Sequence, residues 1–302
     1  MGTIGSRMQD NNIENKEKPV RNIAFSCHPA KESLPPLVQT MLKWTKKNKI
    51  TSRLSPTMAK LVSMPELVFD DEYLRNQADM FVVLGGDGTI LSDARDYAEY
   101  NLPIAGINLG HLGFMTLEEP KNAITALRRL KVGNYFVEPR MMLRTNVYRD
   151  GEKVYSGIAL NDVVIQKAPM LRVIKINVSI SGKIINTYQG DGLIVSTPTG
   201  STAYSLSAGG PIVPPWVNVM IICPLNSHML SARPVIAADN EVLSCRIACV
   251  HSIVELVLDG QSNFKLLNND VVEIIKAEQI SQIVVFKKRN FFNVLRTKMS
   301  WG

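Results

Sequence analysis

The chain has 302 residues, which is enough for one large domain or two ordinary ones. Hydrophobic residues make up 45% of the sequence and charged residues 20%, so the chain can bury a sizeable core. No apolar run approaches the roughly 20 residues that span a bilayer, and residues 1–19 are polar, without the apolar segment of a signal peptide. These features predict a globular cytoplasmic protein without a membrane partner, preceded by a disordered leader over residues 1–19.

The formal net charge is +7, and the sequence contains no helix-turn-helix, zinc-finger or aromatic RNA-binding signature. We therefore expect no nucleic-acid partner. The basic residues gather in two short stretches, around residues 43–49 and 287–298, which are typical of a solvated helix face and a basic tail. A mildly positive surface also suits a polyanionic substrate such as ATP.

The first part of the chain alternates short apolar segments with segments of helical periodicity. The predicted strands are 23–26, 79–84 and 103–107, and the predicted helices are 37–44, 89–100 and 120–130. This order predicts a doubly wound, Rossmann-like α/β domain over residues 20–140.

Beyond Arg140 the sequence changes to short strands separated by turn residues. Asp150-Gly151 between two alternating segments predicts a hairpin. The predicted strands are 143–148, 153–158, 173–180, 184–189, 193–195, 242–250, 253–258, 271–275 and 282–286. They predict an all-β domain over residues 141–285, built as a two-sheet sandwich, and a tail over 286–302 with a short helix at 291–299.

The most informative segment of the first domain is Gly85-Gly86-Asp87-Gly88-Thr89, which we call the phosphate loop. It follows an apolar strand and precedes a helix, so its glycines and the helix N-terminus can offer main-chain amides to phosphate groups. Asp87 is out of place among such amides unless it binds a metal ion or accepts a proton, and phosphoryl transfer needs both. The alternative is an ordinary N-cap aspartate. A second loop, residues 108–114 with His111, should lie beside the phosphate loop and line the same cleft.

The second domain contains two further candidate binding segments. Residues 190–211 include hydroxyl side chains at positions 196, 197, 199, 201, 202, 205 and 207, more than a turn requires, and Ser201 or Thr202 could cap a short helix. These hydroxyl groups could donate to phosphates, ribose hydroxyls and base edges. Asn161-Asp162 precedes a strand, and its amide and carboxylate suit a ribose diol, although such a pair is also common in turns.

Together these motifs resemble the NAD kinase family, from residue 23 to the C-terminus. Further matching segments are Leu230-Ser231-Ala232-Arg233-Pro234 and Asp259-Gly260-Gln261. The phosphate loop alone also resembles that of diacylglycerol and sphingosine-type lipid kinases, so a lipid kinase is the alternative function. A nucleotide-sensing protein without turnover is a second alternative, and the intact Asp87 argues against it.

The resemblance implies an active site between the two domains, in which Asp87 is the base for the 2′-hydroxyl of the adenosine ribose of NAD. It implies that Gly88 contacts the same substrate, that Asn161 and Asp162 bind near a ribose, and that Asp191 contacts the nicotinamide end. The residues implied around the adenine are Thr202, Ala203, Tyr204, Ser205, Leu206 and Ser207.

The resemblance also implies ATP as co-substrate, a divalent metal cation such as Mg²⁺ with unknown ligands, and a homo-oligomer, either dimer or tetramer. Two positions depart from the family pattern. The family usually has Asn-Glu in place of Asn161-Asp162. Gln189 stands where some bacterial members carry a basic residue, and Arg172 could supply that charge instead.

Overall fold

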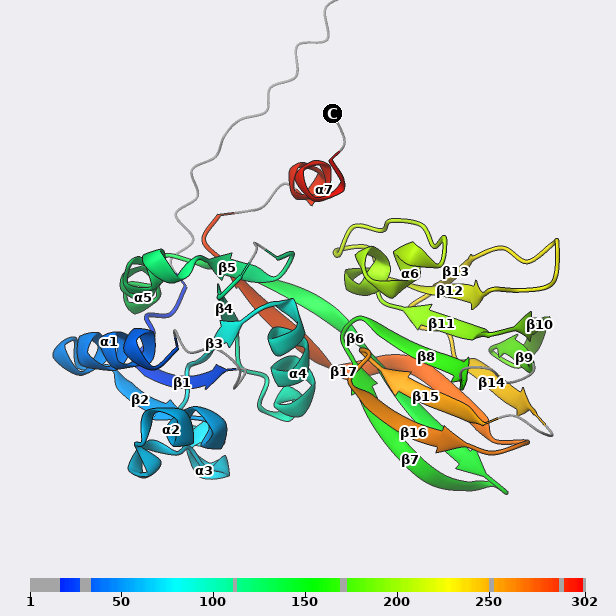
Figure 1. Ribbon diagram of the computed structural model, residues 1–302, viewed down its shortest axis with the longest axis horizontal. Coiled ribbons are helices and arrows are strands. Elements are labelled where there is room, and N and C mark those ends of the chain that lie inside the picture. Colours follow the sequence, from blue (N-terminus) through cyan, green and yellow to red (C-terminus); the bar gives the residue numbers. More distant parts are fainter. Residues whose placement is uncertain are drawn as a thin grey trace, which may run out of the picture.

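The structure is a computed structural model that describes residues 17–27, 34–110, 113–168, 173–249, 253–287 and 291–300. Two domains lie side by side along the long axis of the molecule, the first mixed α/β and the second mostly β (Figure 1). Among the described residues, none of the helices has the length and apolar character needed to cross a membrane.

The N-terminal domain is built on a parallel sheet with strand order β2-β1-β3-β4. Its strands are β1 (Asn22–Cys27), β2 (Thr51–Leu54), β3 (Met80–Gly85), β4 (Ile104–Asn108) and β5 (Thr116–Glu118), which pairs with β4. Its helices are α1 (Leu34–Lys47), α2 (Pro56–Val62), α3 (Asp71–Asn76), α4 (Asp87–Asp96) and α5 (Ala123–Lys131), with 3₁₀ turns η1 (Pro65–Leu67), η2 (Ala98–Tyr100) and η3 (Pro120–Asn122).

Helices cover both faces of this sheet, because every residue of β3 is apolar or glycine and alternate side chains enter two different cores. Val82 packs in one core with α1, α2 and α5, and Phe81 packs in the other with α3 and α4. The prediction of a doubly wound α/β domain is therefore confirmed. The sequence analysis missed β2, α2 and α3, which are only four to seven residues long.

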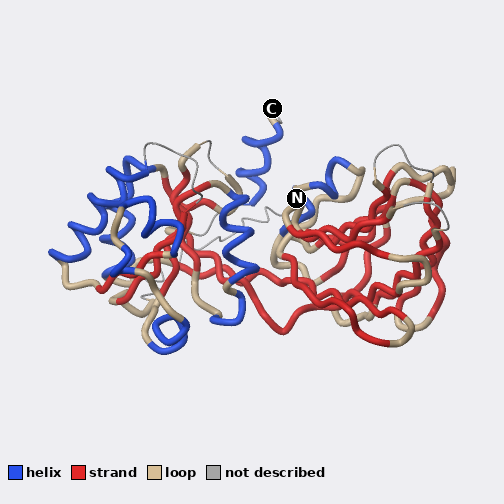
Figure 2. The backbone as a smooth tube through the Cα atoms, turned by 60° about the horizontal axis from the view of Figure 1, so that its bottom comes forward, coloured by secondary structure: helices blue, strands red, loops and turns tan. Residues whose placement is uncertain are grey.

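The C-terminal domain contains two facing sheets (Figure 2). One includes β6 (Phe136–Arg149), β7 (Glu152–Ala159), β9 (Ile174–Ile180), β10 (Lys183–Gly190), β14 (Leu243–Ala248) and β17 (Val271–Val285). The other has the order β13-β12-β11-β8-β15-β16, with β8 (Asp162–Lys167), β11 (Gly192–Ser196), β12 (Val219–Leu225), β13 (Val235–Ala238), β15 (Val254–Leu258) and β16 (Ser262–Leu266). Side chains from both sheets, such as Val178, Val195 and Leu256, share one core, which confirms the predicted sandwich.

Three local predictions can be compared with this domain. Asp150 and Gly151 form the predicted hairpin turn with positive φ angles of 51° and 88°. The helix predicted at 291–299 is α7 (Phe291–Met299). The two strands predicted at 271–275 and 282–286 are wrong as separate elements, because β17 continues through an irregularity between Lys276 and Ile280 while pairing with β6 throughout.

The long strand β17 joins the two domains. It pairs with β6 and β14 in the sandwich, and Ile283 near its end pairs in parallel with Ile104 of β4. One mixed sheet of 11 strands therefore runs through both domains. At the other end of the chain, Glu17 and Lys18, which the sequence analysis assigned to the leader, are hydrogen-bonded to the N-terminal domain.

Candidate active site

The phosphate loop turns the chain from β3 into α4. Gly85 ends the strand, Gly86 is the N-cap residue, and Asp87 is the first residue of the helix. A Cβ atom on Gly85 would lie 2.2 Å from Oγ1 of Thr89, so only glycine allows this tight turn. The predicted strand–loop–helix order is confirmed, although the helix begins at Asp87 and not at Thr89.

The carboxylate of Asp87 is fixed by the second loop. Oδ2 accepts a hydrogen bond of 2.8 Å from the amide of Phe114, and Oδ1 accepts one of 3.1 Å from the amide of Met115. A Cβ atom on Gly113 would lie 2.0 Å from Oδ1, so the loop can approach this closely only at a glycine. The N-cap alternative fails because Gly86 occupies that position. His111 and Leu112 lie outside the described residues.

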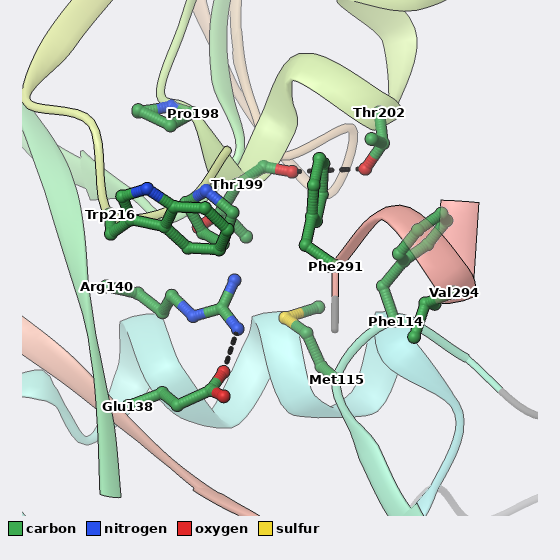
Figure 3. Close-up of a pocket in the computed structure, with 11 residues that line it drawn as sticks. Phe114, Met115, Glu138, Arg140, Pro198, Thr199, Thr202, Trp216, Phe291 and Val294 are labelled. Atoms are coloured by element: carbon green, nitrogen blue, oxygen red, sulfur yellow. Dashed lines mark hydrogen bonds and ion pairs between the residues drawn. The ribbon is translucent and has the colours of Figure 1, made fainter. Parts of the chain in front are cut away.

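The second loop, which holds Asp87, and the hydroxyl-rich segment (residues 196–207) line one pocket (Figure 3). Phe114 and Met115 line it from the N-terminal domain, and Thr199 and Thr202 line it from the C-terminal domain. Further lining residues are Glu138 and Arg140, which form an ion pair, and the aromatic side chains of Trp216 and Phe291. The groove between the domains is thus lined by one ion pair, by hydroxyl groups and by aromatic side chains.

Many hydroxyl groups of the hydroxyl-rich segment hold the segment itself. Ser196, Thr197 and Ser201 are fully buried. Thr197 donates to the carbonyl oxygen of Leu160 at 2.6 Å, and Ser201 accepts from the amide of Val213 at 3.0 Å. For these three residues, the interpretation that the surplus hydroxyl groups serve a ligand is wrong.

The remaining hydroxyl groups are better placed for a ligand. The segment forms η4 (Thr199–Thr202) and α6 (Tyr204–Ser207), and the N-cap of α6 is Ala203 without a side-chain bond, so the predicted caps are wrong. Tyr204 is 45% exposed, and Ala203, Leu206 and Ser207 are also partly or fully open to solvent. The buried Oγ1 of Thr199 and Oγ of Ser205 have no hydrogen-bond partner.

Asn161 and Asp162 are held in place by Asp259. Its carboxylate accepts hydrogen bonds from three successive main-chain amides, those of Leu160, Asn161 and Asp162, at 2.7–3.1 Å. Asp162 opens β8 and is only 4% exposed. Burial, with a further contribution from Asp259, raises the pKa of Asp162 to about 7.

Two residues connect this turn to the phosphate loop. Gln261 donates from Nε2 to the carbonyl oxygen of Gly88 at 2.8 Å, and its Oε1 accepts from Arg95 at 3.2 Å. Arg95 also lies 3.8 Å from the carboxylate of Asp259. The structure therefore brings Gly88 and the Asn161–Asp162 turn into one polar network. Arg95 was missed, although its position two turns after Asp87 on α4 could have drawn attention to it.

Gln189 and Asp191 lie elsewhere in the C-terminal domain. Gly192 pairs with Gln166 and Ser196 pairs with Asp162, so Asp191 is at the end of β11 opposite to Asp162, roughly 15 Å away by strand rise. Asp191 bonds Asn226 at 2.9 Å and Lys167 at 3.4 Å, and these contacts lower its pKa. Within one chain these residues are not next to Asp87. Arg172 lies outside the described residues.

A second, polar pocket lies on the N-terminal side of the phosphate loop. It lies at the carboxyl end of β1, which has β2 on one side and β3 on the other. This is the usual ligand position in doubly wound sheets. Its lining comprises Ser26, Cys27, Ser55, Pro56, Thr57, Gly86, Gly88, Thr89, Ser92, Asp93, Asp96, Tyr97 and Gln261. We call this the switch-point pocket. Main-chain amides and hydroxyl groups of this kind suit a polyphosphate.

A doubly wound domain with a glycine-rich loop lining one pocket, and with the Asp87 carboxylate held by a loop that lines another, is typical of a phosphotransferase that acts on an alcohol group. Comparison with known proteins gives the family. Residues 23–135 match the ATP-NAD kinase N-terminal domain, and residues 160–286 match the ATP-NAD kinase C-terminal domain. The chain belongs to the ATP-NAD kinase family.

Relatives with this activity in their names align over most of their length. The NAD kinase of Natranaerobius thermophilus is 36% identical, over 94% of this chain and 99% of that protein. The NAD kinase of Symbiobacterium thermophilum is 41% identical, over 82% of this chain and 87% of that protein.

Solved structures support the fold. A yeast NADH kinase complexed with NADH has a TM-score of 0.84 at 21% identity, covering 94% of this chain and 88% of that chain. An NAD kinase from Archaeoglobus fulgidus in complex with ATP has a TM-score of 0.70 at 24% identity, covering 93% of this chain and all of that chain.

Proposed function

We propose that the chain phosphorylates NAD to NADP, transferring a phosphoryl group from ATP to the 2′-hydroxyl of the adenosine ribose. The observation that carries this proposal is the Asp87 carboxylate, held by two main-chain amides beside a groove that both domains line. Membership of the ATP-NAD kinase family supports the same reaction.

In this proposal NAD binds in the groove between the domains. Its adenine is surrounded by the segment that runs from Thr202 to Ser207, and its ribose lies near Gly88, Asn161 and Asp162. Asp191 contacts the nicotinamide end, and Gln189 and Arg172 are further NAD-binding residues. Asp191 and Asp162 lie at opposite ends of β11, so the dinucleotide would extend along the sandwich or reach a second subunit of the predicted homo-oligomer.

The chemical step follows from the position of Asp87. Its carboxylate accepts the proton of the 2′-hydroxyl while the hydroxyl oxygen attacks the γ-phosphorus of ATP and ADP leaves. Main-chain amides of the phosphate loop donate to the transferred group. A divalent cation, when bound, neutralises phosphate charge. Gly85, Gly86 and Thr89 shape the loop, and Gln261 holds it against the Asn161–Asp162 turn.

The lipid-kinase alternative finds no support, because the match to ATP-NAD kinases extends through the C-terminal domain. We further propose a cytoplasmic location, a homo-oligomer, a requirement for Mg²⁺ and domain limits at residues 140 and 285.

The direct test is an assay of the purified chain with NAD or NADH, Mg²⁺ and a series of donors: ATP, other nucleoside triphosphates and polyphosphate. We expect a product carrying phosphate on the 2′-position of the adenosine ribose. Absence of this product with every donor, or phosphorylation of diacylglycerol in vesicles, would contradict the proposal.

A further inference from the structure

A buried carboxylate in the switch-point pocket has no role in the mechanism described so far. Asp93 lies on α4, one and a half turns beyond Asp87, and lines this pocket together with Ser26 and Gly86. The residue is only 7% exposed, and its Oδ2 atom is buried without a hydrogen-bond partner. A buried, unpaired carboxylate oxygen is costly, so a partner is expected when the pocket is filled.

The charge of the pocket points to a cation. Its described lining residues include two carboxylates, Asp93 and Asp96, but no lysine, arginine or histidine. A triphosphate that entered without a counter-ion would meet two negative groups in a partly desolvated site. A divalent cation that accompanies the ligand would offset these two negative groups.

The oxygen atoms on this side of α4 suit a hard divalent cation. Thr89, Asp93 and Asp96 are spaced by four and three residues, so they lie on one face of the helix. Mg²⁺ prefers oxygen ligands and is commonly held by one or two carboxylates together with substrate phosphates and water. Asp96 is already engaged by Ser92 and Arg95, at 3.1 and 3.3 Å, which leaves Asp93 as the available carboxylate.

We propose that Asp93 is a protein ligand of the divalent cation that accompanies the phosphate donor, with Asp96 at the rim of the same site. This inference rests on the proposed function, because the donor phosphates complete the cation's coordination. Burial raises the pKa of Asp93 to about 7, opposed by a hydrogen bond from Ser26, so a bound cation competes with a proton near neutral pH.

The test measures Mn²⁺ binding by the electron paramagnetic resonance of the free ion. The whole chain is titrated with Mn²⁺ in the presence of an ATP analogue that has nitrogen between its β- and γ-phosphorus atoms. We expect Asp93→Asn to bind Mn²⁺ about tenfold more weakly or worse. Asp93→Cys should bind Cd²⁺ in preference to Mn²⁺, because a thiolate is a softer ligand.

Glu99→Gln is the matched control. It removes one carboxylate from η2, just beyond α4, where Glu99 forms an exposed ion pair with Arg75 and does not line the pocket. Its Mn²⁺ affinity should equal that of the wild type. Thermal unfolding checks that each variant is folded. If Asp93→Asn does not fold, Asp93→Cys provides an independent test of the cation site.

Two results separate the inference from the proposed function. If the wild type forms NADP but folded Asp93→Asn binds Mn²⁺ as tightly as the wild type, or Asp93→Cys gains no preference for Cd²⁺, the inference is overturned and the function stands. If the wild type does not form NADP with any of the donors, the proposed function itself fails.

Discussion

The phosphate loop and the hydroxyl-rich segment both contain candidate site residues, but their polar side chains have different partners. In the phosphate loop, the side chain of Asp87 is held by the main-chain amides of Phe114 and Met115, two residues that line the groove between the domains. In the hydroxyl-rich segment, the side chains of Thr197 and Ser201 bond main-chain groups of the protein.

A polar sequence motif can therefore either act on a ligand or satisfy main-chain groups of the protein itself. A loop closed by glycines needs no side-chain cap, so its one carboxylate can be positioned for chemistry by the neighbouring loop. A loop closed by proline and a 3₁₀ turn leaves main-chain groups unpaired, and buried hydroxyl groups then satisfy them. Substitutions in the first loop should therefore change turnover, and those at the buried hydroxyl groups should change stability.

The largest expected effect is on turnover in Asp87→Asn. The amide cannot accept the proton of the 2′-hydroxyl, so kcat for NADP formation should fall by about 10²–10⁴. The variant should still fold, but its free energy of unfolding should fall by about 1–3 kcal/mol, because the amide oxygen replaces only one of the two oxygens that accept from Phe114 and Met115. Steady-state kinetics and thermal unfolding together check this. Near-normal kcat would remove Asp87 from the proposed role.

A smaller loss is expected for Gly113→Ala, which does not touch the carboxylate chemically. The new Cβ atom would lie 2.0 Å from Oδ1 of Asp87, so the carboxylate or the loop must shift. A displacement of about 1 Å near the reacting atoms can lower kcat by roughly 10². Gly182→Asn is the control, because a Cβ atom there meets nothing within 4 Å and asparagine tolerates its positive φ. If Gly113→Ala kept full kcat, the position of Asp87 would not depend on this approach.

The phosphate loop was more predictable from sequence than the hydroxyl-rich segment, for a physical reason. A continuous apolar strand followed by glycines and a helix fixes both the local fold and the sheet edge at which Asp87 must lie. Whether the hydroxyl group of Ser201 faces a ligand or the amide of Val213 depends on a chain segment 12 residues away. The same holds for Arg95, whose partners Asp259 and Gln261 come from the other domain.

The pH dependence of stability tests the carboxylate of Asp162, which lies between the phosphate loop and the hydroxyl-rich segment. Asp162 pairs with Ser196 in the sheet and has a pKa raised to about 7, so the folded protein retains a proton that the unfolded chain loses near pH 4. Its contribution to stability is therefore present at low pH and lost as the pH rises from about 4 to about 7.

Asp162→Asn should remove this loss, so the variant should gain stability relative to the wild type as the pH rises through that window. The gain should be on the order of 2 kcal/mol in the free energy of unfolding, measured by urea denaturation at several pH values without NAD. A difference between the two proteins that does not vary with pH would contradict the raised pKa.

A comparable effect on stability alone is expected for Ser201→Ala. This change leaves the buried amide of Val213 without its partner, so the free energy of unfolding should fall by about 1–3 kcal/mol. At temperatures where the variant is fully folded, kcat should stay close to that of the wild type. A large drop in kcat without a change in stability would mean that Ser201 serves the ligand after all.

The smallest effect is expected for Tyr204→Ala, which examines the part of the hydroxyl-rich segment that remains open. Tyr204 is 45% exposed, so its removal should leave the free energy of unfolding within about 0.5 kcal/mol. If the ring packs on the adenosine of NAD, the KM for NAD should rise by about tenfold while kcat changes little, because the contact is the same in the ground and transition states. Trp216→Ala is a useful companion variant, because Trp216 lines the groove between the domains. An unchanged KM for NAD in Tyr204→Ala would assign the adenine contact to Thr199 and Ser205, whose buried hydroxyl groups have no partner. The ligand-binding hydroxyl groups would then be the buried ones without a hydrogen bond, and not the exposed ones.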